Sequence, residues 1–430
     1  MKHIVRSLTV RYMKKITEFA KNYSHVLLAF IKWTAISTLT GAVCGCVGAA
    51  FHYAVNFATA TRQDHPYLIF FLPVVGVLIV LMYRLLRTQN NMGTDYIIDS
   101  VRTTDNIPIL LAPLIFVGTF LTHLCGGSAG REGAALQLGG SIAQNIGRIL
   151  RLDSKDMSLI VLSGMSGVFA ALFGTPLTAT LFALEVVSVG IIYYSGSIPC
   201  LVSSLVSYSI SRLLGVNAED YKLNNVPEFD AIPLLKVAVL AALCAILSIV
   251  FCKAMKYSRI VFARLVKNPY LRAFCGGICI VLLSLIFSSH DYNGAGMDII
   301  EKAIGGNAVP WAFAVKLLFT AITIGCGFKG GEIVPCFFIG STFGCIAGSL
   351  LGLDAGFGAA IGLISLFCGS VNCPIASLFL SIELFGQQGI IFFALACAVS
   401  YILSGYSGLY DTQKIVYSKL RAEYINITAE

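Results

Sequence analysis

The sequence predicts an all-α polytopic membrane protein built from two inverted repeats with broken, tilted helices. Three observations lead to this fold class: the composition, a series of interrupted apolar segments, and an internal repeat. Of 430 residues, 57% are hydrophobic and only 12% are charged. Because this leaves too little polar surface to cover a soluble globule, we expect a multi-pass protein with the lipid bilayer as its surroundings.

The first segment, residues 1–24, is expected to form a cytoplasmic amphipathic helix. Its bases alternate with apolar residues at helical spacing, as in a helix that lies in the membrane interface. These bases are Lys2, Arg6, Arg11, Lys14, Lys15 and Lys21. No small-residue cleavage site follows a short apolar core, so a removable signal peptide is not expected. The net charge of +8 lies mainly at the ends and in short loops, which argues against a nucleic-acid partner.

Apolar segments then follow one another to about residue 405. Gly or Pro interrupts many of them, and several are shorter than the roughly 20 residues of a clean helical crossing. Broken helices leave backbone N–H and C=O groups unpaired, which a bilayer tolerates only where protein or a water-filled cavity satisfies them. We therefore expect ions to bind at these breaks.

An internal repeat appears in the same order in both halves of the chain. The segment GTPLTATLFALE, which ends at Glu185, is similar to NCPIASLFLSIE, which ends at Glu383. Upstream, REGAALQLGGS is similar to GEIVPCFFIGS, and a weaker match joins residues 91–101 to 294–304. The matching acids Glu185 and Glu383 are expected to be structural, as helix caps or hydrogen-bonding groups at the interface between the repeats.

The charges of the connecting segments give the two halves opposite orientations. Residues 216–231 form a polar, acidic linker, whereas both termini are basic. By the positive-inside tendency the linker is extracellular and the ends, including a short tail at 413–430, are cytoplasmic. The first repeat at 25–215 and the second at 232–412 would each cross the membrane an odd number of times. Inverted repeats with discontinuous helices are typical of transporters whose site lies near the bilayer midplane.

Glu132 is the first candidate for chemistry, in the glycine-rich break GGSAGREGAAL. A carboxylate at membrane depth is costly to ionise, so it can exchange protons near neutral pH. The start of a helix offers unpaired N–H donors and a positive dipole end that suit an anion. The carboxylate and an anion would compete for one site, which couples their movements. The alternative is an ion pair with Arg131 at the lipid interface.

Other kinds of site are poorly supported by the residue patterns. The glycine-rich stretch lacks the Lys-Ser/Thr ending of a phosphate loop. The six histidines show no metal-ligand spacing, so neither a metal site nor a zinc protease is expected. We find no nucleophile–base pattern of an enzyme and no cofactor motif. The fourteen cysteines lie singly in apolar runs and are expected to be reduced and structural.

The stretch GREG at Gly130–Gly133, its partner GGEIVP at Gly330–Pro335, and the inverted halves resemble the CLC family of anion channels and anion/proton antiporters. The resemblance covers nearly the whole chain. It implies a CLC-type fold and a homodimer in the cell membrane, here a bacterial plasma membrane, with one pathway per subunit. It also implies that Glu132 is the gating glutamate that carries the proton and that Tyr410 is the inner-gate tyrosine. The anion pathway implied by the resemblance is lined by Met92, Gly93, Gly130, Arg131, Gly133, Gly331, Ile333 and Val334.

Three departures from the chloride transporters resemble the fluoride/proton antiporter branch of this family. Met92 stands where a serine coordinates chloride, Glu332 stands where an apolar residue follows the signature glycine, and Val186 stands where an internal proton-transfer glutamate is found. Fluoride is small and basic, so a protonated carboxyl can donate a hydrogen bond to it. The alternative for Glu332 is a structural acid tied to a nearby amide or to Lys329.

Two positions depart from the expected branch, because Val334 replaces a threonine and Ala134 replaces the proline that commonly follows GREG. Lys316 and Lys329 either attract anions or extend to the interface. The resemblance predicts an antiporter that exports cytoplasmic fluoride in exchange for protons and confers fluoride resistance. A chloride/proton antiporter and a passive CLC anion channel remain as alternatives, with chloride as the other candidate ion.

Overall fold

The computed structural model describes residues 2–86, 93–223 and 225–429, and within these ranges it is almost entirely helical. The first half of the chain forms eight of the described α-helices: α1 (Lys2–Asp64), α2 (Leu72–Leu85), α3 (Thr94–Thr103), α4 (Leu111–Leu124), α5 (Glu132–Ile149), α6 (Ser154–Phe173), α7 (Pro176–Glu185) and α8 (Ser197–Leu213). The short 3-10 helices η1 (Pro66–Phe71) and η2 (Tyr194–Gly196) connect α1 to α2 and lead into α8.

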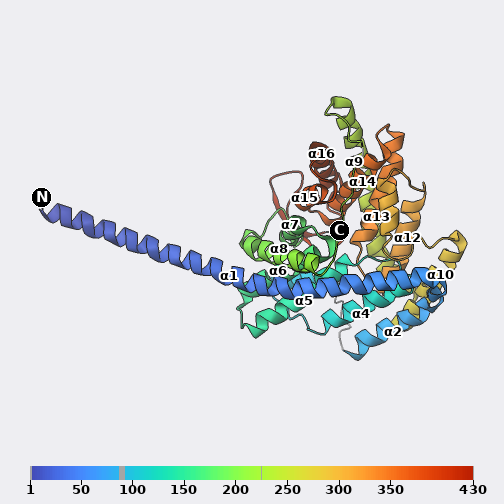
Figure 1. Cartoon of the computed structure of the whole chain (residues 1–430), viewed down its shortest axis with the longest axis horizontal. Helices are drawn as coiled ribbons and strands as arrows, with labels where there is room; N and C mark the ends of the chain where they lie inside the picture. Colours follow the sequence, from blue (N-terminus) through green and yellow to red (C-terminus); the bar gives the residue numbers. More distant parts are fainter. Residues whose placement is uncertain (1, 87–92, 224, 430) are drawn as a thin grey trace.

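The second half of the chain repeats this series of helices. Its helices are α9 (Ala231–Leu265), α10 (Pro269–Phe287), α11 (Met297–Ile304), α12 (Ala312–Gly325), α13 (Ile333–Leu350), α14 (Ala355–Val371), α15 (Pro374–Phe385) and α16 (Ile390–Leu403). Several helices at the same place in the series have equal lengths, with 14 residues in both α4 and α12 and 18 in both α5 and α13, whereas α1 has 63 residues and α9 has 35. Within the described residues, six helical segments are long and apolar enough to cross a membrane, one of them made of η1 and α2 together, and the other helices are shorter or less apolar. The predicted architecture of two repeats of broken helices is confirmed (Figure 1).

Each half caps a helix of the other half. At the end of α7, the carboxylate of Glu185 accepts hydrogen bonds from the backbone N–H groups at the start of α15, at Ile375 (3.2 Å) and Ala376 (2.9 Å). At the end of α15, the carboxylate of Glu383 accepts hydrogen bonds in the same way at the start of α7 (2.9 and 2.8 Å). A carboxylate at a helix N-terminus satisfies unpaired donors and the positive dipole end. The prediction that these two acids are structural caps is confirmed.

Glycines allow the central helices to approach backbone to backbone. A Cβ atom built on Gly139 of α5 would lie 2.1 Å from the carbonyl oxygen of Gly164 in α6. In the second half, a Cβ on Gly340 of α13 would lie 2.6 Å from the carbonyl oxygen of Gly362 in α14. Small residues at such crossings let helices pack closely in a membrane. This packing holds α5 and α13 in fixed positions at the centre of the molecule.

The N-terminal region forms one long helix. Helix α1 is continuous from Lys2 to Asp64, and its first part projects from the body of the molecule (Figure 1). The expected division at residue 24 is therefore not a helix boundary, because the sequence contains no Gly or Pro before Gly41. The expected linker, 216–231, occupies the connection between α8 and α9.

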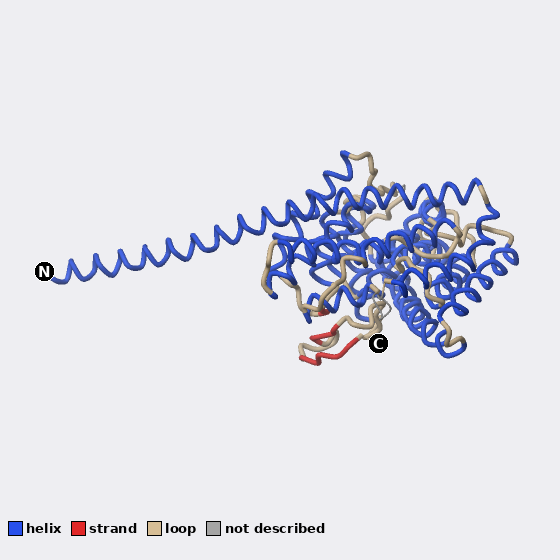
Figure 2. The backbone as a smooth tube through the Cα atoms, turned by 90° about the horizontal axis from the view of Figure 1, so that it is seen from below, coloured by secondary structure: helices blue, strands red, loops and turns tan. Residues whose placement is uncertain are grey.

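The described part of the tail, 413–430, contains two strands. Strand β1 (Ser188–Val189) pairs in parallel with β2 (Lys414–Tyr417), which pairs antiparallel with β3 (Tyr424–Thr428). The small sheet lies at the edge of the helical body (Figure 2). It attaches the end of the chain to the segment that follows α7.

Candidate functional site

The glycine-rich breaks of the two halves meet at the centre of the molecule. Gly130 and Gly331 form an antiparallel bridge in which each backbone N–H donates to the carbonyl of the other residue at 2.7 Å. A Cβ on Gly331 would lie 2.4 Å from the backbone nitrogen of Gly133, so this approach requires glycine. Helices α5 and α13 begin directly after the bridge, and their N-termini therefore converge on one place.

The side chain of Glu132 occupies this place. It is fully buried, and its Oε2 accepts a hydrogen bond from the backbone N–H of Arg131 at 2.9 Å. The backbone N–H of Val334, at the start of α13, also faces the carboxylate. Its Oε1 has no hydrogen-bond partner among the described residues, although the Nε atom of Arg131 lies 3.4 Å away. Since helix N-termini bind anions, the carboxylate sits where a small anion could replace it.

Arg131 connects this centre to a cavity on the side of the linker. Its Nη2 atom lies 3.1 Å from Oε1 of Glu219 in the linker, and its Nη1 atom lies 3.1 Å from Nδ1 of His52. Arg131 and Arg62 line a cavity of about 380 Å³, which we call the linker-side cavity. The ion pair of Arg131 with Glu132 is present, but it is buried rather than interfacial.

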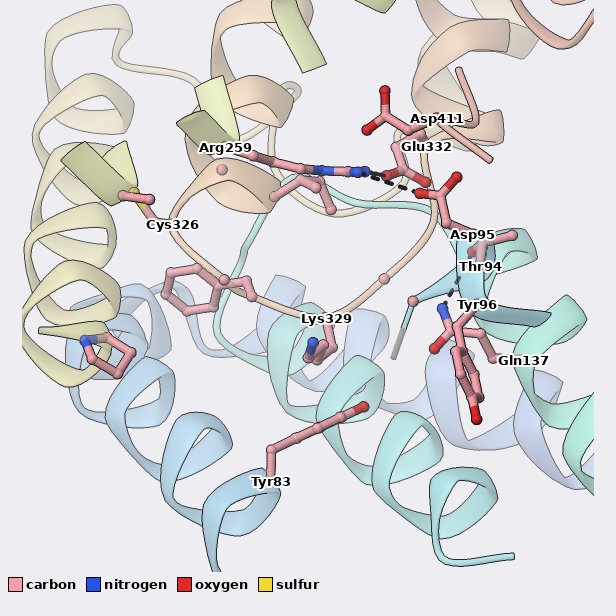
Figure 3. Close-up of a pocket in the computed structure, with 18 of the residues that line it drawn as sticks. Tyr83, Thr94, Asp95, Tyr96, Gln137, Arg259, Cys326, Lys329, Glu332 and Asp411 are labelled. Atoms are coloured by element: carbon pink, nitrogen blue, oxygen red, sulfur yellow. Dashed lines mark hydrogen bonds and ion pairs between the residues drawn. The ribbon is translucent and has the colours of Figure 1, made fainter. Parts of the chain in front are cut away.

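A larger cavity of about 970 Å³ lies on the side of the C-terminal tail, and we call it the tail-side cavity. Gly93, Gly330, Glu332 and Tyr410 line it, and Figure 3 shows Glu332 in its wall. Tyr410 is buried, and its hydroxyl has no hydrogen-bond partner in the described part of the chain. A buried hydroxyl is almost always hydrogen-bonded, so an unpaired one at a cavity wall suits a ligand that accepts a hydrogen bond.

Glu332 forms its ion pair with a residue that the sequence analysis missed. Its Oε1 lies 2.5 Å from the Nη2 atom of Arg259, from α9, and the Nη1 atom of the same guanidinium lies 3.6 Å from Oδ2 of Asp95, from α3 (Figure 3). The pairing with Lys329 that was kept as an alternative for Glu332 is not formed, because Lys329 Nζ lies over the ring of Tyr83, 4.3 Å from its centroid. An arginine within an apolar helix is the signal that could have identified this cluster.

The buried lysine of α12 decides between the two alternatives left open for it. Lys316 is fully buried and donates hydrogen bonds to the carbonyl oxygens of Tyr292 (3.1 Å) and Gly294 (2.7 Å). It therefore does not extend to the membrane interface. Its Nζ atom instead lies behind the turn that borders the linker-side cavity, which Asn293 and Ala295 line.

The structure brings most of the predicted site residues together. Gly130, Arg131, Gly133 and Gly331 surround Glu132 through the bridge and the start of α5. Ile333 and Val334 are buried in the first turn of α13, and Val334 supplies an apolar side chain where a hydroxyl was expected. Gly93 precedes α3 at the wall of the tail-side cavity. Met92 lies outside the described residues.

Comparisons with known proteins agree with this arrangement. A family model described as "Voltage gated chloride channel" matches residues 75–405. The chain is 33% identical over 413 residues to a "Chloride/fluoride channel protein" of Pseudomonas syringae pv. tomato, which covers 94% of this chain and 91% of the relative. It is 26% identical to an "H(+)/Cl(-) exchange transporter ClcA" of Vibrio vulnificus, with 89% and 87% covered.

Solved structures show the same fold. A crystal structure of a CLC-type fluoride/proton antiporter superimposes with a TM-score of 0.86 at 32% sequence identity, and covers 89% of this chain and 98% of that one. A slow cyanobacterial Cl−/H+ antiporter superimposes with a TM-score of 0.76 at 20% identity, with 86% and 94% covered. The family match over most of the chain, the relatives and the convergent helix N-termini lead to one conclusion: this chain is a multi-pass membrane protein that belongs to the CLC family.

Proposed function

We propose that this protein is a fluoride/proton antiporter that exports cytoplasmic fluoride in exchange for inward protons. The observation that carries the proposal is the position of the Glu132 carboxylate, fully buried where the N-termini of α5 and α13 meet. On one side of it, Arg131 lines the linker-side cavity. On the other side, Gly330 and Glu332 line the tail-side cavity. Glu132 and the Gly130–Gly331 bridge therefore separate two compartments.

Proton coupling follows from the competition for one set of backbone donors. While Glu132 is ionised, its carboxylate accepts the N–H groups at the helix starts and excludes an anion. A proton removes its charge and weakens these charge-assisted hydrogen bonds. An anion then takes the same donors, and the protonated side chain moves away from them. Each anion passage thus requires that Glu132 gains and loses a proton.

The tail-side cavity is assigned to the cytoplasmic face, and the linker-side cavity to the outside, following the charges of the termini and linker. In this orientation the unpaired hydroxyl of Tyr410 is a hydrogen-bond donor for an anion that enters from the cytoplasm. Fluoride is the most basic halide, so it gains most from O–H donors such as this hydroxyl. Glu332 would add a second donor only in a state in which its carboxyl has left Arg259 and taken up a proton. Removal of fluoride from the cytoplasm would give the cell resistance to that ion, and we assign the homodimer of the family to this chain.

Two other functions compete with this proposal. A relative at 33% identity is described as a channel, and passive flux would require an open path past Glu132. More distant relatives are described as chloride exchangers. The similarity to a CLC-type fluoride/proton antiporter over 98% of that chain favours fluoride exchange over both.

The coupling mechanism is tested with Glu132→Gln in liposomes loaded with fluoride. Glutamine keeps the size of the side chain but cannot carry a transportable proton, so fluoride efflux should no longer move protons. Glu219→Gln is the matched control, because Glu219 also pairs with Arg131 but lies in the linker; it should keep proton coupling. Undiminished proton movement in Glu132→Gln would contradict the assigned role.

A further inference from the structure

The two cavities are built from corresponding elements of the two repeats. In the tail-side cavity, Arg259 near the end of α9 lies beside Asp95 at the start of α3. In the linker-side cavity, Arg62 near the end of α1 lies in the same cavity wall as Asp298 at the start of α11. Asp95 and Asp298 occupy the same position when residues 91–101 are aligned with 294–304. Among the several charged residues of each cavity, one arginine and one aspartate therefore lie at related places in the two repeats.

The two arginines differ in their partners. Arg259 is paired with Glu332 at 2.5 Å and with Asp95 at 3.6 Å. The corresponding acid on the other side, Glu132, is paired with Arg131 instead. Arg62 consequently has no ion pair within 4.0 Å among the described residues, and its Nε and Nη1 atoms have no hydrogen-bond partner there.

Arg62 is buried and faces the cavity. Its residue is 8% exposed, it lines the linker-side cavity, and a Cβ built on Gly294 would lie 3.1 Å from its Nη2 atom. A buried guanidinium without a close anionic partner is unfavourable, because it has lost water and the charge of Asp298 acts on it only from beyond 4.0 Å. An anion in the cavity would supply the missing partner and the missing hydrogen-bond acceptor.

The surroundings favour a single small anion. The Nζ atom of Lys316 lies behind the same turn, where it donates hydrogen bonds to the carbonyl oxygens of Tyr292 and Gly294. The residues that line the cavity include the bases Lys302 and His290 and the acids Asp291 and Asp298. Both acids disfavour a multiply charged anion. With a volume of about 380 Å³, the cavity accepts a hydrated halide.

We propose that Arg62 forms an external halide-binding site in the linker-side cavity, distinct from the place occupied by the Glu132 carboxylate. The assignment of this cavity to the external face, and of fluoride as its natural ligand, rests on the proposed function; the binding of a halide there does not. The site holds an anion next to Arg131 and raises its local concentration at the outer end of the pathway. It therefore sets the affinity for external fluoride without setting the proton coupling.

The site is tested first by binding, without any transport. Crystals of the full-length protein grown in bromide should show an anomalous peak at the Arg62 guanidinium. The peak should be lost in Arg62→Gln and kept in Arg259→Gln, the matched variant in the other cavity. No peak at Arg62 in the wild-type protein, or an unchanged peak in Arg62→Gln, would overturn the proposal.

A second test uses membrane vesicles of defined orientation from cells that make the full chain. In right-side-out vesicles, Arg62→Gln should raise the half-saturating external fluoride concentration for uptake about tenfold, the effect of one lost charge-assisted hydrogen bond. Arg62→Lys, which keeps the charge, should restore part of this affinity. In inside-out vesicles, which expose the cytoplasmic face, the half-saturating concentration of added fluoride should be unchanged in all variants. The number of protons moved per fluoride should also stay the same.

Equal changes on both faces, or no change on the external face, would overturn the proposal. Failure of the proposed function gives a different result: wild-type vesicles then show no proton-coupled fluoride flux, while the bromide peak still decides whether the site exists.

Discussion

The ion-pair cluster of the tail-side cavity makes an asymmetric prediction about stability. Replacing Arg259 by Gln leaves the carboxylates of Glu332 and Asp95 facing the same space without their cation. Replacing Glu332 by Gln leaves Arg259 with Asp95 at 3.6 Å, so part of the pairing remains. Arg259→Gln should therefore be the more destabilising of the two substitutions.

The magnitude follows from the burial of the pair. Breaking a fully buried ion pair costs about 3–5 kcal/mol. The Glu332 side chain is only 8% exposed but the Arg259 side chain is 36% exposed, so water screens part of the interaction. We therefore expect the free energy of unfolding to fall by less than that range, by about 2 kcal/mol for Arg259→Gln and about 1 kcal/mol for Glu332→Gln.

The double variant, Arg259→Gln with Glu332→Gln, tests whether the two residues are energetically coupled or contribute to stability independently. Without both groups, Asp95 keeps its hydrogen bonds from the backbone N–H (3.2 Å) and hydroxyl of Thr412, and the repulsion between two carboxylates is gone. The double variant should therefore unfold at a higher temperature than Arg259→Gln alone in detergent, followed by intrinsic fluorescence. If the losses simply add, the two residues are not coupled and the reasoning fails.

Three further substitutions test other parts of the structure. Glu185→Ala removes the acceptor of two backbone N–H groups of α15 and should destabilise the protein by about 2–4 kcal/mol. Glu185→Gln should retain part of the lost stability, and equal melting temperatures of the two variants would contradict the capping role. Tyr410→Phe removes a hydroxyl without a described partner, so the melting temperature should stay unchanged while the half-saturating cytoplasmic fluoride concentration rises. A lower melting temperature with unchanged transport would contradict the assignment of this hydroxyl to anion binding. Gly340→Ala would place a methyl group 2.6 Å from the carbonyl oxygen of Gly362 and should reduce the yield of folded protein in size-exclusion chromatography. A normal yield would show that α13 and α14 can separate.

The repeat explains why much of the fold was predictable. Both helices that start at the central bridge follow a glycine-rich stretch, and both caps end a matched segment, so local patterns gave α5, α13 and the roles of Glu185 and Glu383. The same logic led to Glu132, because an acid in a break between apolar helices has few structural explanations.

The missed features depend on contacts between distant segments. Arg259 lies near Glu332 only because the end of α9 packs beside the start of α13, which no local pattern encodes. The pairing of β1 with β2 joins Ser188 to Lys414, and a strand of two residues has no periodicity to detect. Arg62 has no ion pair among the described residues, and Glu132 pairs with Arg131 instead. Only the three-dimensional structure shows these pairings.

The central claim is that fluoride and proton movements are coupled in this protein. The direct measurement uses purified wild-type protein in fluoride-loaded liposomes, with a fluoride electrode and a pH probe outside, repeated with chloride. The account predicts that fluoride efflux drives protons into the liposomes against their own gradient, with little movement of chloride. Fluoride or chloride flux without proton movement would contradict it and indicate a channel, and proton-coupled chloride flux equal to that of fluoride would show that Glu332 does not confer selectivity.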